Sequence, residues 1–376
     1  MPGTRARPHG IMRYSNKMGV HTRKSELSNR KCTARRSPSA IDLFAGCGGL
    51  TQGLKDAGFR VLGAVEIDPL AVATYKANHP HVFVWSKNIQ RVTATQLLHQ
   101  LGLKKGELDL LAGCPPCQGF SAIRCLNGGR EIYDKRNDLI RDFLRLTKGL
   151  GPKTIMLENV PGLWKDQRLA DFRHKLEKLG YHVKADIRDA QNFGVPQRRQ
   201  RVIVIAGLGR RIKWAPKSRH IHTVRKALRK VPSPNSNEDL MHDSQDNRSV
   251  RIRNLIARIP KNGGSRSDLP HRYKLECHKR CNGFKDVYGR IAWDKVAPTI
   301  TGGCFNPSKG RFLHPEENRT ITLREAAILQ GFPHDYLFPE IPGKTAVAEM
   351  IGNALPPEFV RRHAVQIKKV LTQPGN

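Results

Sequence analysis

The chain has 376 residues, 38% of them hydrophobic, which is enough for one large domain and a smaller one. Its net charge of +34 indicates a polyanionic partner, with nucleic acid as the first candidate and a generally basic surface as the alternative. No apolar run long enough for a membrane span or a secretory signal occurs, so we expect neither. Eight irregularly spaced cysteines fit a reducing compartment.

Short apolar runs alternate with helical patterns along the first half of the chain. A glycine turn and a helix follow the first run, and Asp68 is expected to cap a helix that has Pro69 at its first position and ends near Asn78. This alternation predicts the α/β class, with a parallel, doubly wound sheet and helices on both faces. The predicted strands are 40–44, 61–65, 82–85, 108–112, 154–157, 181–187 and 202–206.

Charge and periodicity divide the chain into four parts. Residues 1–38 carry ten Lys and Arg against one acid and are expected to form a disordered basic arm. Residues 39–207 hold the predicted sheet. Residues 208–290 are basic and rich in turn signals, which predicts a small second domain. Residues 291–376 are expected to return to the first domain, with helices near 322–330 and 357–371.

The stretch from Gly113 to Ser121 follows a strand-like run and holds two cysteines separated by two prolines. The proline rings fix the backbone, so the thiols are displayed rigidly. The C-x-x-C spacing of Cys114 and Cys117 is compatible with a redox pair, half of a zinc site, inert cysteines or a nucleophile. The prolines are unfavourable for the helix that a redox pair usually opens, and a second pair of zinc ligands is lacking.

A second motif, Asp42 to Leu50, reads as strand, glycine turn and helix. Gly46 and Gly48 let the backbone approach a ligand closely, and Glu66 ends the next strand, where a carboxylate reaches ribose hydroxyls. The pair fits an adenosine-containing cofactor. The turn lacks the full dinucleotide spacing, which favours S-adenosylmethionine over a nicotinamide cofactor. Phe44 is either a platform for the adenine or a core residue.

Two further groups are candidates for the same crevice. Glu158 ends the strand expected beside the one that leads to Cys117, where an acid suits protonation of a ring nitrogen while sulfur attacks. A helix cap or a solvated carboxylate is the alternative. Arg199 and Arg201 alternate along an extended chain and therefore point to one side, toward phosphate or a base carbonyl, or else form a solvated charge run.

Seven blocks in a fixed order resemble the DNA (cytosine-5)-methyltransferase family of bacterial restriction-modification systems. They are DLFAGCGGL, the Glu66 strand end, GCPPCQGFS, ENV, QRRQR, RTITLREAAILQGFP and GNALPP, and they cover residues 39–207 and 287–372. The resemblance implies a Rossmann-like S-adenosylmethionine methyltransferase sheet that carries the catalytic and cofactor sites. It also implies that residues 208–290 form a target-recognition domain and that C5 of cytosine in a specific double-stranded DNA sequence is methylated.

The resemblance also implies roles for individual residues. Cys117 would attack C6 of a flipped cytosine, Glu158 would protonate N3, and Arg199 and Arg201 would steady the base. Asn88 stands where the family usually has an aspartate, and its amide oxygen can accept the same bond from adenine. The implied cofactor residues are Phe44, Ala45, Gly46, Gly48, Gly49, Glu66, Ile67, Asn88, Pro116 and Asn353, and the implied DNA contacts are Gln118, Ser121, Arg124 and Arg130; no metal site is implied.

The expected setting follows from the same resemblance. We expect a monomer that acts on double-stranded DNA in a bacterial cytoplasm, associated with the nucleoid and not with a membrane, and a cognate restriction endonuclease in the same system without direct contact. Residues 122–135 are expected to form a loop that closes on the base. Two alternatives are a tRNA cytosine methyltransferase on the same scaffold, whose Cys-Phe-Thr signature residues 281–284 do not match, and a catalytically silent DNA-binding protein.

Overall fold

The computed structural model describes residues 36–116, 138–234, 239–243, 247–280, 285–339 and 343–373. Residues Ser37–Asn376 form one compact unit. The predicted basic arm, residues 1–38, lies almost entirely outside the described ranges. Within those ranges, no helix combines the length and the apolar character that crossing a membrane requires.

A seven-stranded sheet of order β3-β2-β1-β4-β5-β7-β6 forms the main part of this unit. All seven predicted strands are confirmed. The expectation of a wholly parallel sheet is wrong at β7, which runs antiparallel to both β5 and β6. A parallel pair needs a crossover of about a dozen residues or more, and β6 and β7 are joined by residues 190–199 alone. The strands are β1 Ser39–Leu43, β2 Arg60–Glu66, β3 Phe83–Ser86, β4 Leu110–Gly113, β5 Thr154–Asn159, β6 Tyr181–Asp189 and β7 Gln200–Leu208.

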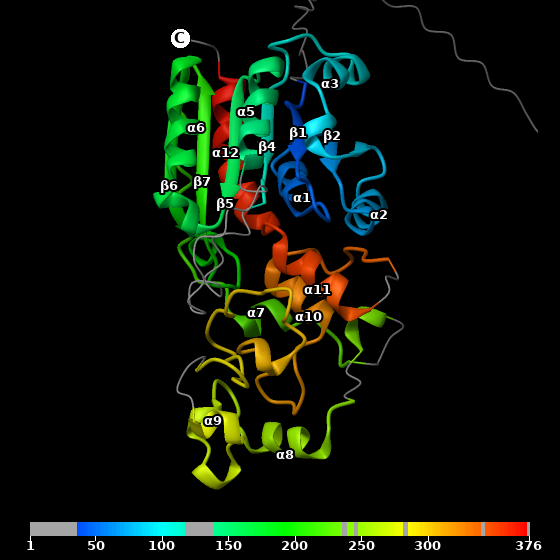
Figure 1. The fold of residues 1–376 in the computed structure, drawn as a ribbon, viewed down its shortest axis with the longest axis vertical. Helices are drawn as coiled ribbons and strands as arrows, with labels where there is room; N and C mark the ends of the chain where they lie inside the picture. The colour runs from blue at the N-terminus through cyan, green and yellow to red at the C-terminus, as the bar shows by residue number, and fades with distance from the viewer. Residues whose placement is uncertain are drawn as a thin grey trace, which may run out of the picture. The chain divides into compact units, whose positions relative to one another are not determined.

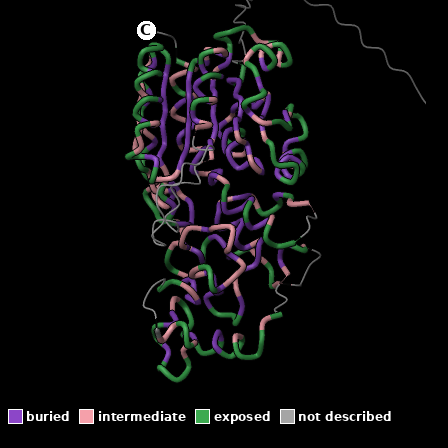
Figure 2. The backbone as a smooth tube through the Cα atoms, in the orientation of Figure 1, coloured by how far each residue is buried: buried purple, intermediate pink, exposed green. Residues whose placement is uncertain are grey.

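Helices cover both faces of the sheet (Figure 1). They are α1 Gly49–Asp56, α2 Pro69–Asn78, α3 Ala94–Leu101, α5 Leu139–Leu150, α6 Gln167–Lys178, α7 Val224–Leu228, α8 Val250–Arg258, α9 Glu276–Arg280, α10 Leu323–Gln330, α11 Lys344–Asn353 and α12 Pro357–Thr372. Alternate strand residues point to opposite faces. Ile41 of β1 packs in the layer of α3, α5 and α6, whereas Ala40 packs in the layer of α1 and α12. Figure 2 shows the resulting buried strands.

Two helices confirm their sequence signals. Asp68 caps α2 by accepting hydrogen bonds from the backbone N–H groups of Leu70 and Ala71, at 2.8 and 3.4 Å, and Pro69 occupies the first position. In α12, Val360, Ala364 and Ile367 are buried against the sheet. Core packing therefore accounts for the helical spacing of the final apolar residues.

The chain after β7 builds a second apolar cluster. Residues of α7 together with Met241 pack with residues 291–351, and α7 and α11 both lie against α10 (Figure 1). A smaller cluster joins α8 to Leu269, Tyr288 and Leu313. The described residues of α7 and Met241 thus share a core with residues 291–376, the return segment. The division into domains at 207 and 290 stays a prediction.

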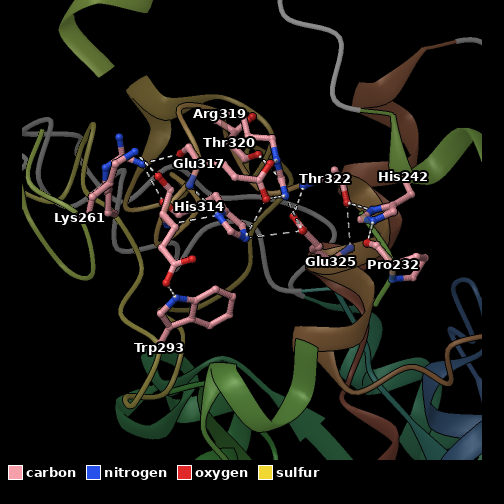
Figure 3. Close-up of polar contacts among 12 residues, drawn as sticks. Pro232, His242, Lys261, Trp293, His314, Glu317, Arg319, Thr320, Thr322 and Glu325 are labelled. Carbon is pink, nitrogen blue, oxygen red and sulfur yellow. Dashed lines mark hydrogen bonds and ion pairs between the residues drawn. The ribbon is translucent and has the colours of Figure 1, made fainter. Parts of the chain in front are cut away.

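A buried network of polar groups connects these segments (Figure 3). Arg319 donates to both carboxylate oxygens of Glu325, at 2.7 and 2.8 Å, and also pairs with Glu317. Glu325 and Thr322 form the capping box of α10. His242 lies 2.8 Å from the Thr322 hydroxyl and 2.7 Å from the carbonyl oxygen of Pro232. Burial opposes the charge on Arg319, but its two carboxylate partners outweigh that effect and raise its pKa.

The same network includes hydrogen bonds around residues 314–318 of the return segment. The indole N–H of Trp293 donates to Glu316 at 2.6 Å, and Lys261 donates to the Asn318 side chain at 2.6 Å. His314 Nδ1 accepts from the backbone N–H of Glu317 at 3.0 Å. Residues 232–261 are therefore joined to residues 293–325 by side-chain contacts as well as by apolar packing.

Arg319→Met should destabilise the fold strongly, because Glu325 would remain buried without its counter-ion. We expect a loss of about 3 to 5 kcal/mol in the free energy of unfolding, measured by urea denaturation. Arg225→Met is the matched control, because Arg225 and Asp294 form an exposed ion pair. This variant should have an unfolding curve close to that of the wild type. Equal losses in the two variants would contradict the assignment.

Strand β1 also carries a buried carboxyl group. Asp42 Oδ2 accepts a hydrogen bond from the Thr51 hydroxyl at 2.7 Å, and that hydroxyl lies 2.7 Å from Tyr75 Oη. Over the described part of the chain, Asp42 Oδ1 has no hydrogen-bond partner. Burial, with a contribution from the charge of Glu66, raises the pKa of Asp42 to about 7. The fold therefore favours the protonated acid.

Asp42→Asn should change how stability depends on pH. The folded pKa is about 7 and the reference value is 3.8, so between these values the folded chain binds more protons than the unfolded chain and wild-type stability falls as pH rises. The stability of the variant relative to the wild type should rise from pH 4 to pH 7 by up to about 4 kcal/mol. Urea denaturation across this range tests it, with the exposed Asp171→Asn as control; parallel wild-type and Asp42→Asn profiles would contradict it.

Candidate active site

A cavity of about 830 Å³ lies at the carboxyl ends of the central parallel strands. Segments after β1, β2, β3, β4 and β5 line it, together with the start of β7 and the end of α11. The carboxyl ends of parallel strands meet at one edge of the sheet, where ligands of such folds bind. The predicted site residues that line it are Phe44, Ala45, Gly46, Gly49, Glu66, Ile67, Asn88, Pro116, Glu158, Arg199, Arg201 and Asn353.

The turn between β1 and α1 forms one wall through an unusual backbone. Phe44, Gly46 and Gly48 all have left-handed φ angles, of 60°, 54° and 96°. A Cβ on Gly46 would meet no atom within 4 Å, so the turn leaves open space there for a ligand. Gly48 is absent from the cavity lining of the described residues. Its missing Cβ instead makes room for the side chains of His79 and Tyr336, each 2.7 Å from the position that this atom would take.

Glu66 at the end of β2 is bound to the same turn. One carboxylate oxygen accepts the Gly46 N–H at 2.7 Å, and the other accepts the N–H groups of Ile67 and Asp68 at 2.7 and 2.9 Å. A carboxylate has about four acceptor positions, so about one remains for a ligand hydroxyl. The turn and the carboxylate thus hold each other in place.

Three other predicted residues surround this carboxylate end of the cavity. The Ile67 side chain is 60% exposed and offers an apolar surface to the cavity. Asn88 caps the short helix Ile89–Arg91, with its Oδ1 accepting the Gln90 N–H at 3.0 Å. Phe44 lines the cavity and also packs against the core, so its position is compatible with both interpretations, and its contact with adenine stays a prediction.

Glu158 and Arg201 form a largely buried ion pair in the lining of the cavity, where Arg201 Nε lies 2.8 Å from Glu158 Oε1. The next residue, Asn159, donates through its side-chain amide to the carbonyl oxygen of Pro115 at 2.9 Å. It therefore fixes the end of the proline stretch beside the acid. Sequence reasoning gave Asn159 no role, although it stands in the same ENV block as Glu158.

The proline stretch holds the two cysteines Cys114 and Cys117. Burial, followed by the nearby charges of Glu158 and Asp42, raises the pKa of Cys114 well above its ordinary value. Cys114 is half-buried, lines the cavity and packs against the core layer of α1 and α12. A thiol that stays neutral is a poor nucleophile, which suits a packing role. Cys117 lies outside the described residues, as do the predicted DNA contacts Gln118, Ser121, Arg124 and Arg130 and the predicted loop 122–135.

Arg199 lines the cavity but is 2% exposed and is held by backbone carbonyl groups. Its two terminal amino groups donate to Ile300 O at 3.2 Å and to Gly352 O at 2.9 Å. Burial, with the charge of Arg201, lowers its pKa. The residue thereby joins the start of β7 to the return segment, a role that the alternating arginine pattern did not reveal; its contact with a base or phosphate stays a prediction.

Comparisons with known proteins agree with this geometry. A model of the C-5 cytosine-specific DNA methylase family matches residues 39–369. The chain is 36% identical over 348 residues to the type II methylase M.HgiDII of Herpetosiphon aurantiacus, covering 89% of this chain and 96% of that protein. It is 34% identical over 340 residues to the type II methyltransferase M1.HphI of Haemophilus parahaemolyticus, covering 88% and 87%.

A solved structure shows the same fold. It is a prophage-encoded protein of E. coli assigned as a DNA modification methyltransferase, with 26% identity, a TM-score of 0.66, and 90% of this chain and 100% of that chain covered. The cavity at the sheet edge, the family match over most of the chain and these relatives agree. The chain belongs to the C-5 cytosine-specific DNA methylase family and is a DNA (cytosine-5)-methyltransferase of the restriction-modification type.

Proposed function

We propose that this enzyme takes a methyl group from S-adenosylmethionine and transfers it to C5 of a cytosine flipped out of a specific double-stranded DNA sequence, through a covalent bond between Cys117 and C6. The observation that supports this most is that one cavity holds both the Glu158–Arg201 pair and the Glu66 glycine turn. A base bound at the ion pair and a cofactor bound at the turn would share this cavity.

The residues of the cavity fit S-adenosylmethionine. Glu66 has acceptor capacity for a ribose hydroxyl, Phe44 and Ile67 offer apolar surfaces for adenine, and Gly46 leaves room beside the turn. Asn88 would accept a bond from the adenine amine, while Ala45, Gly49, Pro116 and Asn353 would complete the pocket. When bound, the cofactor supplies an electrophilic methyl group on a sulfonium centre.

Covalent catalysis overcomes the poor nucleophilicity of cytosine C5. The Cys117 thiolate adds to C6, and Glu158 in its acid form protonates N3, so that the ring accepts the electron pair. C5 becomes an enamine carbon and takes the methyl group. Loss of the C5 proton to a base then restores the C5–C6 double bond and expels Cys117 as thiolate, and N3 returns its proton to the Glu158 carboxylate. Arg201 orients Glu158 through the ion pair at 2.8 Å.

DNA is the substrate of this family, and the remaining assignments concern how it is bound. The target base is unreachable inside a duplex, so it must leave the stack before Cys117 can attack. We assign Gln118, Ser121, Arg124 and Arg130 to DNA contacts and residues 208–290 to target recognition. The protein acts as a monomer in the cytoplasm, and a cognate restriction endonuclease belongs to the same system without direct contact. Residues 1–38 add non-specific electrostatic attraction to DNA phosphates.

Replacing the nucleophile should abolish the reaction. Cys117→Ser removes the soft thiolate, and incorporation of labelled methyl from S-adenosylmethionine into genomic DNA should fall to background. Cys114→Ser is the matched thiol control, because we assign Cys114 to packing, and it should retain methyl incorporation well above background. Methyl incorporation retained by Cys117→Ser would contradict the mechanism. Bisulfite sequencing of DNA from cells that express the wild type should show methylcytosine at one recurring sequence.

Glu158→Gln should lower kcat by about a hundredfold or more, because the amide cannot transfer a proton to N3. The apparent KM for S-adenosylmethionine should change little, since we assign cofactor binding to the Glu66 turn and not to Glu158. The exposed Glu177→Gln on α6 is the control. Single-turnover methylation rates measure the effect, and a wild-type rate in Glu158→Gln would remove Glu158 from the chemistry.

A further inference from the structure

Two side chains from outside the glycine turn bind its backbone carbonyl groups. The Tyr336 hydroxyl donates to Cys47 O at 2.6 Å, and His79 Nε2 lies 3.3 Å from Gly48 O. Tyr336 and His79 are themselves 3.2 Å apart, between Oη and Nε2. Both are buried, at 3% and 1% exposure, and neither belongs to the cavity lining of the described residues. They act on the turn from outside the cavity.

The protons of this cluster have one consistent arrangement. Lys55 Nζ lies 3.3 Å from His79 Nδ1, so the lysine donates and Nδ1 accepts. His79 Nε2 then carries the hydrogen and donates to Gly48 O, while the Tyr336 hydroxyl keeps its own hydrogen for Cys47 O. Burial, with the charge of Lys55, lowers the pKa of His79 to about 4, so the imidazole is neutral at physiological pH.

The cluster is packed so tightly that it leaves no space for a side chain on Gly48. A Cβ there would lie 2.7 Å from both His79 Nε2 and Tyr336 Oη. The ring of Tyr75 packs edge-on against His79 with 4.9 Å between centroids. The two partners therefore hold fixed positions against the turn.

These two residues come from distant parts of the chain that are bound to each other. Asn78 at the end of α2 donates to Leu337 O at 2.8 Å and accepts the Leu337 N–H at 2.9 Å. The consecutive residues Asn78 and His79 thus contact the consecutive residues Leu337 and Tyr336, respectively. Asn78 and His79 both contact residues 336–337. Among the described hydrogen bonds, Asn78 makes none to the glycine turn, so it serves as a matched control.

We propose that Tyr336 and His79 are positioning residues for cofactor binding, which hold Cys47 and Gly48 so that the turn keeps the backbone that presents Gly46 and Glu66 to the cofactor. The inference rests on the proposed use of S-adenosylmethionine. Gly46 and Gly48 adopt their left-handed backbone freely, but Phe44 between them and β1 has a φ of 60°, a strained conformation for a non-glycine residue that persists only when its surroundings fix it. The two hydrogen bonds to the carbonyl groups supply that constraint.

The test is Tyr336→Phe, which removes the hydroxyl and keeps the ring. Equilibrium dialysis with labelled S-adenosylmethionine and the full chain should show a Kd raised about fivefold to tenfold, the effect of one lost buried hydrogen bond. In steady state, KM for the cofactor should rise by a similar factor. The kcat at saturating cofactor and the KM for DNA should stay near wild type.

His79 provides an independent pair of variants. His79→Leu should raise the Kd for S-adenosylmethionine as Tyr336→Phe does, because it removes the donor to Gly48 O. His79→Gln keeps an N–H donor at a similar distance from the backbone and should restore most of the affinity. A Gln variant as weak as the Leu variant would contradict a role for this hydrogen bond.

Asn78→Ala separates positioning from general loosening of the segment. It removes both bonds to Leu337 and should leave the cofactor Kd at the wild-type value. Unchanged binding in Tyr336→Phe, or an equal rise in Asn78→Ala, would overturn the inference. A wild-type protein that binds no S-adenosylmethionine would instead contradict the proposed function itself, so the two failures are distinguishable.

Discussion

The parallel pairing of β1, β2, β4 and β5 is the constraint on which the site depends. It places the carboxyl ends of these strands at one edge, so the glycine turn, Glu66, the proline stretch and Glu158 line a single cavity. The antiparallel strand β7 completes the arrangement. Because it runs the other way, its beginning meets the end of β5, with Val202 opposite Asn159, and this brings Arg201 to Glu158.

The return segment provides the second part of the site from the far end of the chain. The end of α11 lines the cavity through Asn353, and Arg199 holds that helix end through Gly352 O. Tyr336 of the same segment holds the outer side of the glycine turn. The buried network around Arg319 and Glu325 connects this segment to residues 232–242. The cavity wall and the described residues near His242 in the basic stretch 208–290 are thus connected through the return segment.

Local signals were readable from the sequence, and contacts between distant residues were not. The strands and the Asp68 cap were predicted correctly because each depends on a few neighbouring residues. The direction of β7 was missed because apolar periodicity carries no information on pairing. Tyr336 and His79 lie 257 residues apart, so no spacing rule could have joined them. The family motifs located Glu66 and Glu158, whereas the partners that fix them became visible only in three dimensions.

In the proposed mechanism Cys117, and not Cys114, bonds to the base in the cavity of Glu158. DNA whose target cytosine is replaced by 5-fluorocytosine tests it most directly, because fluorine cannot leave C5 as a cation and the covalent adduct persists after methyl transfer. Peptide mapping of the trapped complex by mass spectrometry should place the nucleotide on Cys117. A nucleotide on Cys114, or no adduct with DNA that the enzyme otherwise methylates, would contradict the account.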